Sequence, residues 1–341
     1  MKTNFIYTIL LILFLIGSCK SSNDLSKNRV FQPKKYLSPP PLKKGDTIMY
    51  IAPAGYVDDS LQYMKRADSL LKSWGFHIKY PKNLYQRSFT FAGTDKQRLE
   101  QLQSAFNDPT IKVIWCARGG YGSVRIIDDI DFSKFNRHPK WVIGYSDITV
   151  LHSLLHQKGY QSVHAFMPIS LAHHRPKRRK QAIRSLKDFF QNKRLSYTIP
   201  SDSLNIQGRG KGIVVGGNIS LLVSLLGSKY QINTDNKILF LEDVGEYEYS
   251  YDRMIYALKN AGYFDHLKAL IIGGTGIKND PDEEDFGESV KEIILKHVKN
   301  KGYPVIFNFP AGHVVDNRTL IFGREASVRV KKDSSYLKYK Y

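Results

Sequence analysis

The chain has 341 residues, of which 42% are hydrophobic and 24% are charged. This balance is typical of a globular protein and excludes a disordered one, and the length allows two domains. Lysine and arginine number 51 against 31 for aspartate and glutamate, so the formal net charge is +20. An anionic membrane, an acidic polymer or nucleic acid could balance that charge. The cations are spread along the chain without a nucleic-acid-binding motif, so we expect no nucleic-acid partner.

The first 19 residues have the layout of an export signal. Lys2 precedes an apolar block that is too short for a comfortable membrane span. The block closes on Ile16–Cys19, which resembles a bacterial lipobox, where the cysteine is acylated after cleavage. We therefore expect lipidation at Cys19 and an exported lipoprotein, anchored on the periplasmic side or in the outer membrane of a Gram-negative bacterium. A plain secretion signal with an incidental cysteine is the alternative.

The next part of the chain predicts an α/β fold. Residues 20–44 are polar and proline-containing, which is typical of a tether. From 45 to 172, apolar runs alternate with helical patterns, which predicts a Rossmann-like domain with helices on both faces of a parallel sheet. Cys116 lies in one of the apolar runs and is expected to be buried. The predicted strands lie within 46–55, 111–120 and 140–147, and the predicted helices within 59–76 and 95–109.

Residues 173–206 are basic, and we expect them to connect two domains. They contain the dense run Arg175–Lys180, which is either a docking patch for acidic material or, as we favour, a solvated segment. Residues 207–341 are expected to form a smaller, C-terminal α/β domain. The predicted elements after residue 173 are a helix at 180–193, a strand and helix within 210–228, a strand at 237–244, a helix at 251–264, a strand at 269–276, an acidic loop at 279–287 followed by a helix, and short strands within 303–312 and 326–341.

A serine stands where the strand within 140–147 turns into a helix. Ser146 has Gly144 two residues before it and Asp147 directly after it. This arrangement indicates a nucleophile elbow, in which a sharp turn projects the hydroxyl from the backbone and nearby helix N–H groups stabilise negative charge. Alternatively, Ser146 or Asp147 merely caps the helix. The stretch by itself does not decide between these two interpretations.

A nucleophilic serine needs a base. His313 follows an apolar strand on a loop shaped by proline and glycine, from which its ring could point into a cleft. The alternative is a loop histidine bonded to the backbone. The other histidines that we considered are less suited, either because they should point away from the elbow or because they lie in the basic connection: His152, His156, His173 and His174.

The base in turn needs a group that orients it. The strand at 237–244 is followed or ended by carboxylates, at the edge of the sheet where active sites of α/β proteins gather. These residues could equally cap the next turn. The carboxylate candidates are Glu242, Asp243 and Glu246. No histidine or cysteine pair stands at metal-ligand spacing, so we expect neither a metal nor another cofactor.

A glycine-rich loop, ARGGYGS, occupies residues 117–123. It lacks the lysine of a P-loop and the glycine pattern of a dinucleotide fingerprint. Glycines let backbone N–H groups approach a reacting oxygen without a clash. We therefore expect this loop to stabilise negative charge on a substrate oxygen.

These segments, in this order, resemble the LD-carboxypeptidase family of serine peptidases, which includes muropeptide carboxypeptidases and microcin immunity proteins. The resemblance extends from about residue 46 to about residue 323. It is carried by ARGGYGS (117–123), PKWVIGYSDITVLH (139–152), GGNISLL (216–222), LFLEDVGEYEYSYDRM (239–254) and FPAGHVVDN (309–317). It implies a catalytic triad of Ser146, His313 and Glu242 in a cleft between the two domains.

The resemblance also implies donors around this triad. The backbone N–H groups of Asp147 and of Gly119 or Gly120 would bind the oxyanion. Arg118 and Asn218 would bind substrate carboxylates, although Arg118 beside two glycines could instead be a structural clamp.

The implied reaction is hydrolysis of the amide bond between a dibasic residue with an L-centre, diaminopimelate or lysine, and a terminal D-alanine in peptidoglycan-derived tetrapeptides. The resemblance further suggests a homodimer. Residues 163–168, VHAFMP, depart from the HGPM that the family tends to show, so substrate contacts there are expected to differ. Two alternatives remain: an amide hydrolase for peptide-nucleotides or acyl-amino acids, like the immunity proteins, and a non-catalytic lipoprotein that binds cell-wall fragments.

Overall fold

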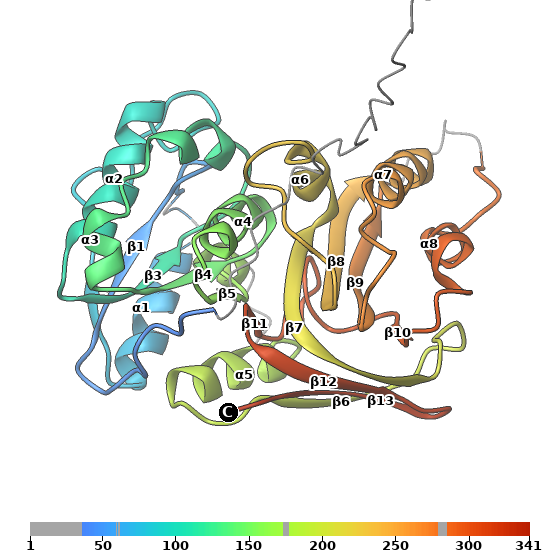
Figure 1. Ribbon diagram of the computed structural model, residues 1–341. Helices are drawn as coiled ribbons and strands as arrows, with labels where there is room; N and C mark the ends of the chain where they lie inside the picture. The colour runs from blue at the N-terminus through green and yellow to red at the C-terminus, as the bar shows by residue number, and fades with distance from the viewer. Residues whose placement is uncertain (1–35, 59, 61, 173–176, 279–284) are drawn as a thin grey trace, which may run out of the picture. The chain divides into compact units, whose positions relative to one another are not determined.

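The structure is a computed structural model, and it describes residues 36–341 except 59, 61, 173–176 and 279–284 (Figure 1). The export signal, Cys19, most of the expected tether and the pair His173 and His174 lie outside the described residues, as do parts of the basic run and the acidic loop.

The N-terminal half is built on a six-stranded sheet with the order β11-β5-β4-β3-β1-β2. Its neighbouring strands are parallel except for β11, which runs antiparallel to β5. Its strands are β1 (Thr47–Ile51), β2 (His77–Lys79), β3 (Ile111–Cys116), β4 (Trp141–Gly144), β5 (Ser162–His164) and β11 (Leu320–Phe322). The helices of this half are α1 (Tyr63–Ser73), α2 (Asp95–Asn107), α3 (Ser133–Arg137) and α4 (Thr149–Gln157).

Helices cover both faces of this sheet, as the alternating pattern predicts (Figure 1). Successive residues of a strand face opposite sides, so β1 sends Ile48 and Tyr50 toward α1 and Met49 and Ile51 toward α2. Cys116 is fully buried in the apolar cluster between the sheet and α2, as expected. The strands are apolar on both faces, which is typical of a parallel sheet enclosed by helices.

The local signals place most helices well. Helix α2 begins with a capping box between Thr94 and Gln97 and ends at Asn107, directly before Asp108 and Pro109. Helix α1 begins at Tyr63 rather than at residue 59, and it ends one turn before Phe76 because Gly75 takes up a left-handed conformation with φ +89°.

The C-terminal half contains a seven-stranded sheet with the order β10-β9-β8-β7-β12-β13-β6. This sheet has one strand more than the sheet of the N-terminal half, although the C-terminal domain was expected to be the smaller of the two. Strands β7 to β10 are parallel, whereas β12, β13 and β6 join antiparallel. The strands are β6 (Ser196–Pro200), β7 (Gly208–Asn218), β8 (Lys237–Glu246), β9 (Ala269–Ile277), β10 (Val305–Ile306), β12 (Glu325–Val330) and β13 (Ser334–Tyr339).

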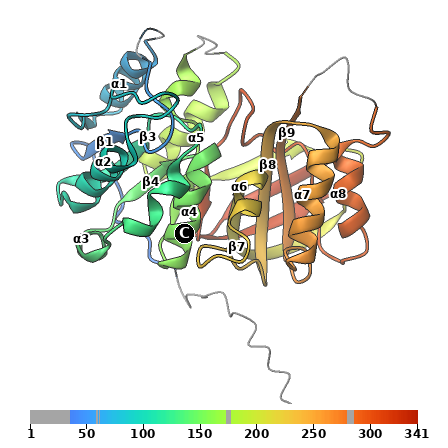
Figure 2. The same ribbon diagram turned by 90° about the horizontal axis from the view of Figure 1, so that it is seen from above.

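One face of this second sheet is covered by three helices, α6 (Ile219–Ser224), α7 (Glu248–Asn260) and α8 (Val290–Val298) (Figure 2). The side chains of the opposite face, among them Ile238, Phe240 and Ile271, belong to the same apolar cluster as α1 and the inner face of the first sheet. The two sheets therefore share one continuous core.

The chain crosses between the halves more often than the sequence suggests. Residues 173–206, expected as a connection, supply helix α5 (Lys180–Phe190) to the core beside α1 and strand β6 to the edge of the second sheet. Residues 207–341 in turn return β11 to the first sheet. Strand pairing between segments so far apart in sequence leaves no local trace, because alternation within a strand says nothing about its partner.

Candidate active site

The turn after β4 has the geometry of a nucleophile elbow. Ser146 is partly exposed and has φ +64°, a left-handed conformation that is rare for a residue with a side chain. Gly144 permits the sharp turn, because a Cβ on it would lie 2.8 Å from Ile148 Cγ1. Neither Ser146 nor Asp147 caps α4 by a side-chain hydrogen bond. The capping interpretation is therefore wrong, and the hydroxyl of Ser146 projects from a strained turn.

A chain of hydrogen bonds links this serine to a histidine and a carboxylate. His313 Nε2 lies 3.1 Å from Ser146 Oγ, and His313 Nδ1 lies 2.6 Å from Glu242 Oε2. The backbone N–H of His313 also donates to Glu242 Oε2, at 3.0 Å. Since an ionised carboxylate can only accept, Nδ1 carries the imidazole proton and Nε2 is left to accept from the serine hydroxyl.

The carboxylate of Glu242 is buried and tightly packed. The Glu242 side chain, on β8 beside an irregularity in the pairing with β9, has an exposed fraction of 0%, whereas that of His313 is 18%. Gly312, with φ +92°, lies so close that a Cβ on it would be 2.6 Å from Glu242 Oε2. Burial by itself would lower the pKa of His313, but the charge and hydrogen bond of Glu242 outweigh it and raise that pKa above its ordinary value.

The glycine-rich loop packs directly against the serine. A Cβ on Gly119 would lie 3.0 Å from Ser146 Cβ, and one on Gly120 would instead approach Gly55. The buried Asp147 carboxylate accepts a hydrogen bond from the backbone N–H of Ser123 at 2.9 Å, which fastens the loop to the elbow. Burial raises the pKa of Asp147. The backbone of the loop therefore stands within reach of a group bonded to the serine oxygen.

The two side chains expected to bind substrate carboxylates have other contacts. Arg118 donates from Nη1 to the carbonyl of Tyr56 at 3.0 Å and from Nε to the carbonyl of Gly119 at 3.3 Å, so it clamps the glycine loop. Asn218 is buried, donates its amide to Asp243 at 2.8 Å and caps α6 through Leu221 N–H. The Asn218 side chain therefore has a structural role at the start of α6, and its role as a substrate ligand stays a prediction.

The remaining candidates are separated from the serine. His152 bonds to Ser162 Oγ and to the carbonyl of Gly144, while His156 bonds to the hydroxyl of Tyr36, so both rings point away from the elbow as expected. Burial lowers the pKa of His152 to about 4 and that of His156 to about 3. Both rings are therefore neutral structural groups at physiological pH.

Three further residues at the site escaped the sequence analysis. Thr149 Oγ1 accepts from the backbone N–H of Asn218 at 3.0 Å and so ties the elbow to β7. The ring of Tyr145 lies 4.9 Å from that of His313. His164 is buried 4.9 Å from Phe240, and neither ring nitrogen has a hydrogen-bond partner in the described part of the chain. The position of Thr149, three residues after Ser146, could have indicated that it lies at the site. The position of His164 depends on tertiary packing, which the sequence does not show.

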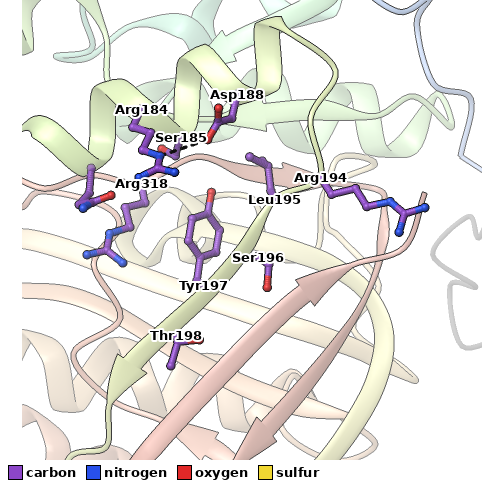
Figure 3. Close-up of a pocket in the computed structure, with 10 residues that line it drawn as sticks. Arg184, Ser185, Asp188, Arg194, Leu195, Ser196, Tyr197, Thr198 and Arg318 are labelled. Atoms are coloured by element: carbon purple, nitrogen blue, oxygen red, sulfur yellow. Dashed lines mark ion pairs between the residues drawn. The ribbon is translucent and has the colours of Figure 1, made fainter.

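A cavity of about 430 Å³ lies between α5 and β6 and contains none of the three linked residues (Figure 3). Arg184, Arg194 and Arg318 line it together with Asp188. Among the residues that the structure describes, no cluster of histidine, cysteine, aspartate or glutamate could hold a metal ion. Within the same residues, no helix has the length and apolar character needed to cross a membrane.

The strain at Ser146 leads to a stability prediction. Glycine adopts a positive φ without a steric penalty, so Ser146→Gly should be more stable than Ser146→Ala by about 1 kcal/mol. Urea unfolding of both variants measures this difference. The matched pair is Ser153→Gly and Ser153→Ala within α4, where the order should reverse because glycine weakens a helix. Equal stability of the two Ser146 variants would contradict a strained elbow.

Known proteins resemble the chain over both halves. Residues 48–165 match the family described as LD-carboxypeptidase N-terminal domain, and residues 211–328 match its C-terminal domain. A probable murein peptide carboxypeptidase from Bacillus subtilis (strain 168) is 33% identical over 306 residues, which cover 88% of this chain and 93% of that protein.

Solved structures agree with this match. The crystal structure of muramoyltetrapeptide carboxypeptidase from Oxalobacter formigenes superimposes with a TM-score of 0.77 at 28% identity, covering 86% of this chain and 99% of that one. The microcin C7 self-immunity protein in its wild-type apo state shares the fold, with a TM-score of 0.78 at 22% identity over 89% of this chain and 99% of that one. The chain therefore belongs to the LD-carboxypeptidase family of peptidases.

Proposed function

We propose that this protein is a serine carboxypeptidase that releases the terminal D-alanine from peptidoglycan-derived tetrapeptides, by hydrolysing its amide bond to a dibasic residue with an L-centre. The observation that carries the proposal is the hydrogen-bonded series Ser146, His313 and Glu242 on a strained elbow. Support for the substrate comes from relatives named for murein peptides and muramoyltetrapeptides. The preference for the dibasic residue rests on the family resemblance.

In the proposed mechanism, His313 Nε2 removes the hydroxyl proton of Ser146 as Oγ attacks the carbonyl carbon of the scissile amide. The tetrahedral intermediate collapses to an acyl-enzyme when the same imidazolium delivers its proton to the departing D-alanine nitrogen. Water, activated by His313, then hydrolyses the ester. Glu242 holds the tautomer of the ring and stabilises the imidazolium, which its buried, 2.6 Å hydrogen bond to Nδ1 suits it to do.

The oxyanion would be met by the N–H of Asp147 and by that of Gly120. The carbonyl of Gly119 accepts from the N–H of Gly55, at 3.1 Å. The peptide bond is trans, so the N–H of Gly120 points opposite to that carbonyl and away from Gly55. Gly119 itself packs on Ser146, so this N–H is the better placed of the two candidates considered. One such donor typically contributes about 100- to 1000-fold in rate.

Arg118 has one guanidinium nitrogen with which it can bind the free carboxylate of the substrate. Its Nε and Nη1 donate to the carbonyls of Gly119 and Tyr56, and Nη2 makes no hydrogen bond to the described residues. Since a guanidinium can bind several acceptors at once, Arg118 can clamp the loop and present its remaining donor to a carboxylate. The +20 net charge further favours an anionic substrate.

The first prediction concerns the product. Purified protein incubated with a disaccharide-tetrapeptide should release D-alanine, measured by mass spectrometry, and Ser146→Ala should slow the release roughly a million-fold. Ser153→Ala, on the next helix, is the matched control and should retain activity. Tight binding without release would instead support the non-catalytic lipoprotein. Hydrolysis of a peptide-nucleotide amide, without release of D-alanine from the tetrapeptide, would support the immunity-type hydrolase. The shared fold is what favours that alternative at present.

The second prediction concerns pH. The imidazole must be neutral to accept a proton, so kcat/KM should fall as the pH drops through the raised pKa of His313. In Glu242→Gln the negative charge is lost while His313 stays buried. The pKa of His313 should therefore fall, and the acid limb of the kcat/KM profile should move to lower pH. The rate should drop about 10⁴-fold, because the tautomer is no longer held. Glu246→Gln, which alters a carboxylate that makes no hydrogen bond to His313 in the described structure, should leave the profile unchanged; an identical shift there would contradict this role for Glu242.

We also propose that the protein is exported and acylated at Cys19, an inference that rests on the lipobox-like sequence. A clickable fatty-acid analogue fed to cells that express the full-length chain should label the mature protein, and Cys19→Ala should abolish the label. Cys116→Ala is the matched control, because that thiol is fully buried and should not affect labelling. Labelling that persists in Cys19→Ala would overturn the proposal.

A further inference from the structure

An exposed aromatic side chain lies on a strained turn near the serine. Phe89 has an exposed fraction of 89% and φ +53°. The turn is held by two backbone hydrogen bonds between Ser88 and Phe91, at 2.9 and 3.0 Å. A bulky residue at positive φ is a steric outlier, and an aromatic ring left in water gains nothing from burial. Both features are unfavourable for stability, and strain of this kind clusters at ligand-binding sites.

Short contacts connect this turn to the elbow. Tyr56 N–H donates to the carbonyl of Thr90, the neighbour of Phe89, at 3.4 Å. The preceding residue, Gly55, donates to the carbonyl of Gly119 at 3.1 Å, and Gly119 packs against Ser146. The strained turn is thus fastened to the loop that flanks the proposed nucleophile, and not to a remote part of the surface.

A second exposed aromatic ring lies in the glycine-rich loop and contacts Phe91 of the same turn. Tyr121, in the glycine-rich loop, has an exposed fraction of 54%, and its ring centroid lies 6.2 Å from that of Phe91. The guanidinium of Arg87 lies 4.0 Å above the ring of Tyr56, and its Nε donates to the carbonyl of Phe89. Exposed apolar faces beside polar donors are suited to a ligand with both an apolar face and hydroxyl groups.

We propose that Phe89 and Tyr121 form an aromatic subsite that stacks on a pyranose ring of the disaccharide carried by the peptide substrate. This inference rests on the proposed function and adds to it that glycan-linked peptides are preferred over free ones. In such a substrate, three residues separate the sugar from the scissile bond, and three extended residues span at most about 11 Å. We assign the sugar to this turn because the turn is connected to Ser146 indirectly, through Tyr56, Gly55 and Gly119.

The test removes the ring without disturbing the turn. Glycine suits φ +53°, so Phe89→Gly should fold with an unchanged or raised Tm. Its kcat/KM for a disaccharide-tetrapeptide should fall about tenfold, with a loss at least fivefold larger than for the free tetrapeptide. Phe89→Trp keeps an aromatic face and should restore the preference. The matched control is Phe286→Gly, an exposed aromatic ahead of α8, which should not alter the ratio of the two substrates.

The outcomes separate this inference from the proposed function. Equal losses on both substrates, or none, would overturn the sugar subsite while D-alanine release still supports the carboxypeptidase. A loss confined to a nucleotide-bearing amide would overturn it in favour of base stacking. Calorimetric binding of the peptide-free disaccharide to Ser146→Ala needs no turnover. If Phe89→Gly does not weaken that binding about tenfold in the same background, the subsite is refuted whether or not any D-alanine is released.

Discussion

The 3.1 Å hydrogen bond between Ser146 Oγ and His313 Nε2 is the contact on which the site depends. Its two residues are 167 positions apart: Ser146 follows β4 of the first sheet, and His313 lies in the loop between β10 and β11. The serine follows the end of β4, and the imidazole is held by the buried Glu242 on β8. The shared core and the hydrogen bond between Thr149 and Asn218 keep the two sheets together, so the packing of the halves is what aligns the site.

Backbone conformation at the site is tightly constrained. Ser146 has a positive φ, and Gly312 must lack a side chain because Glu242 lies where its Cβ would be. Gly119 is required by the same kind of close approach to the serine. Such positions lower stability, and they persist because the surrounding core and hydrogen bonds determine their geometry. The strained turn at Phe89 belongs to the same pattern at the margin of the site.

The sequence predicted features that depend on neighbouring residues. Helix α2, strands β3 and β4 and the elbow follow from local periodicity, capping and glycine placement, which act over a few positions. It did not predict that β11 joins the first sheet or that β6 joins the second, because pairing partners leave no local pattern. Asn218 was expected to bind substrate, but a side chain just before a helix can serve as its cap, and Asp243 then takes up its amide.

The order of motifs in the sequence alone indicated the family and the three residues that could act together, since each motif is a short run with its own chemistry. The tertiary structure alone decided their distances, the burial of Glu242 and the raised pKa of His313. It also decided that neither Ser146 nor Asp147 caps α4, and that the side chains of Arg118 and Asn218 hold neighbouring segments of the chain. These outcomes depend on atoms brought within about 3 Å by segments far apart in the chain, and no pattern within one segment records that proximity.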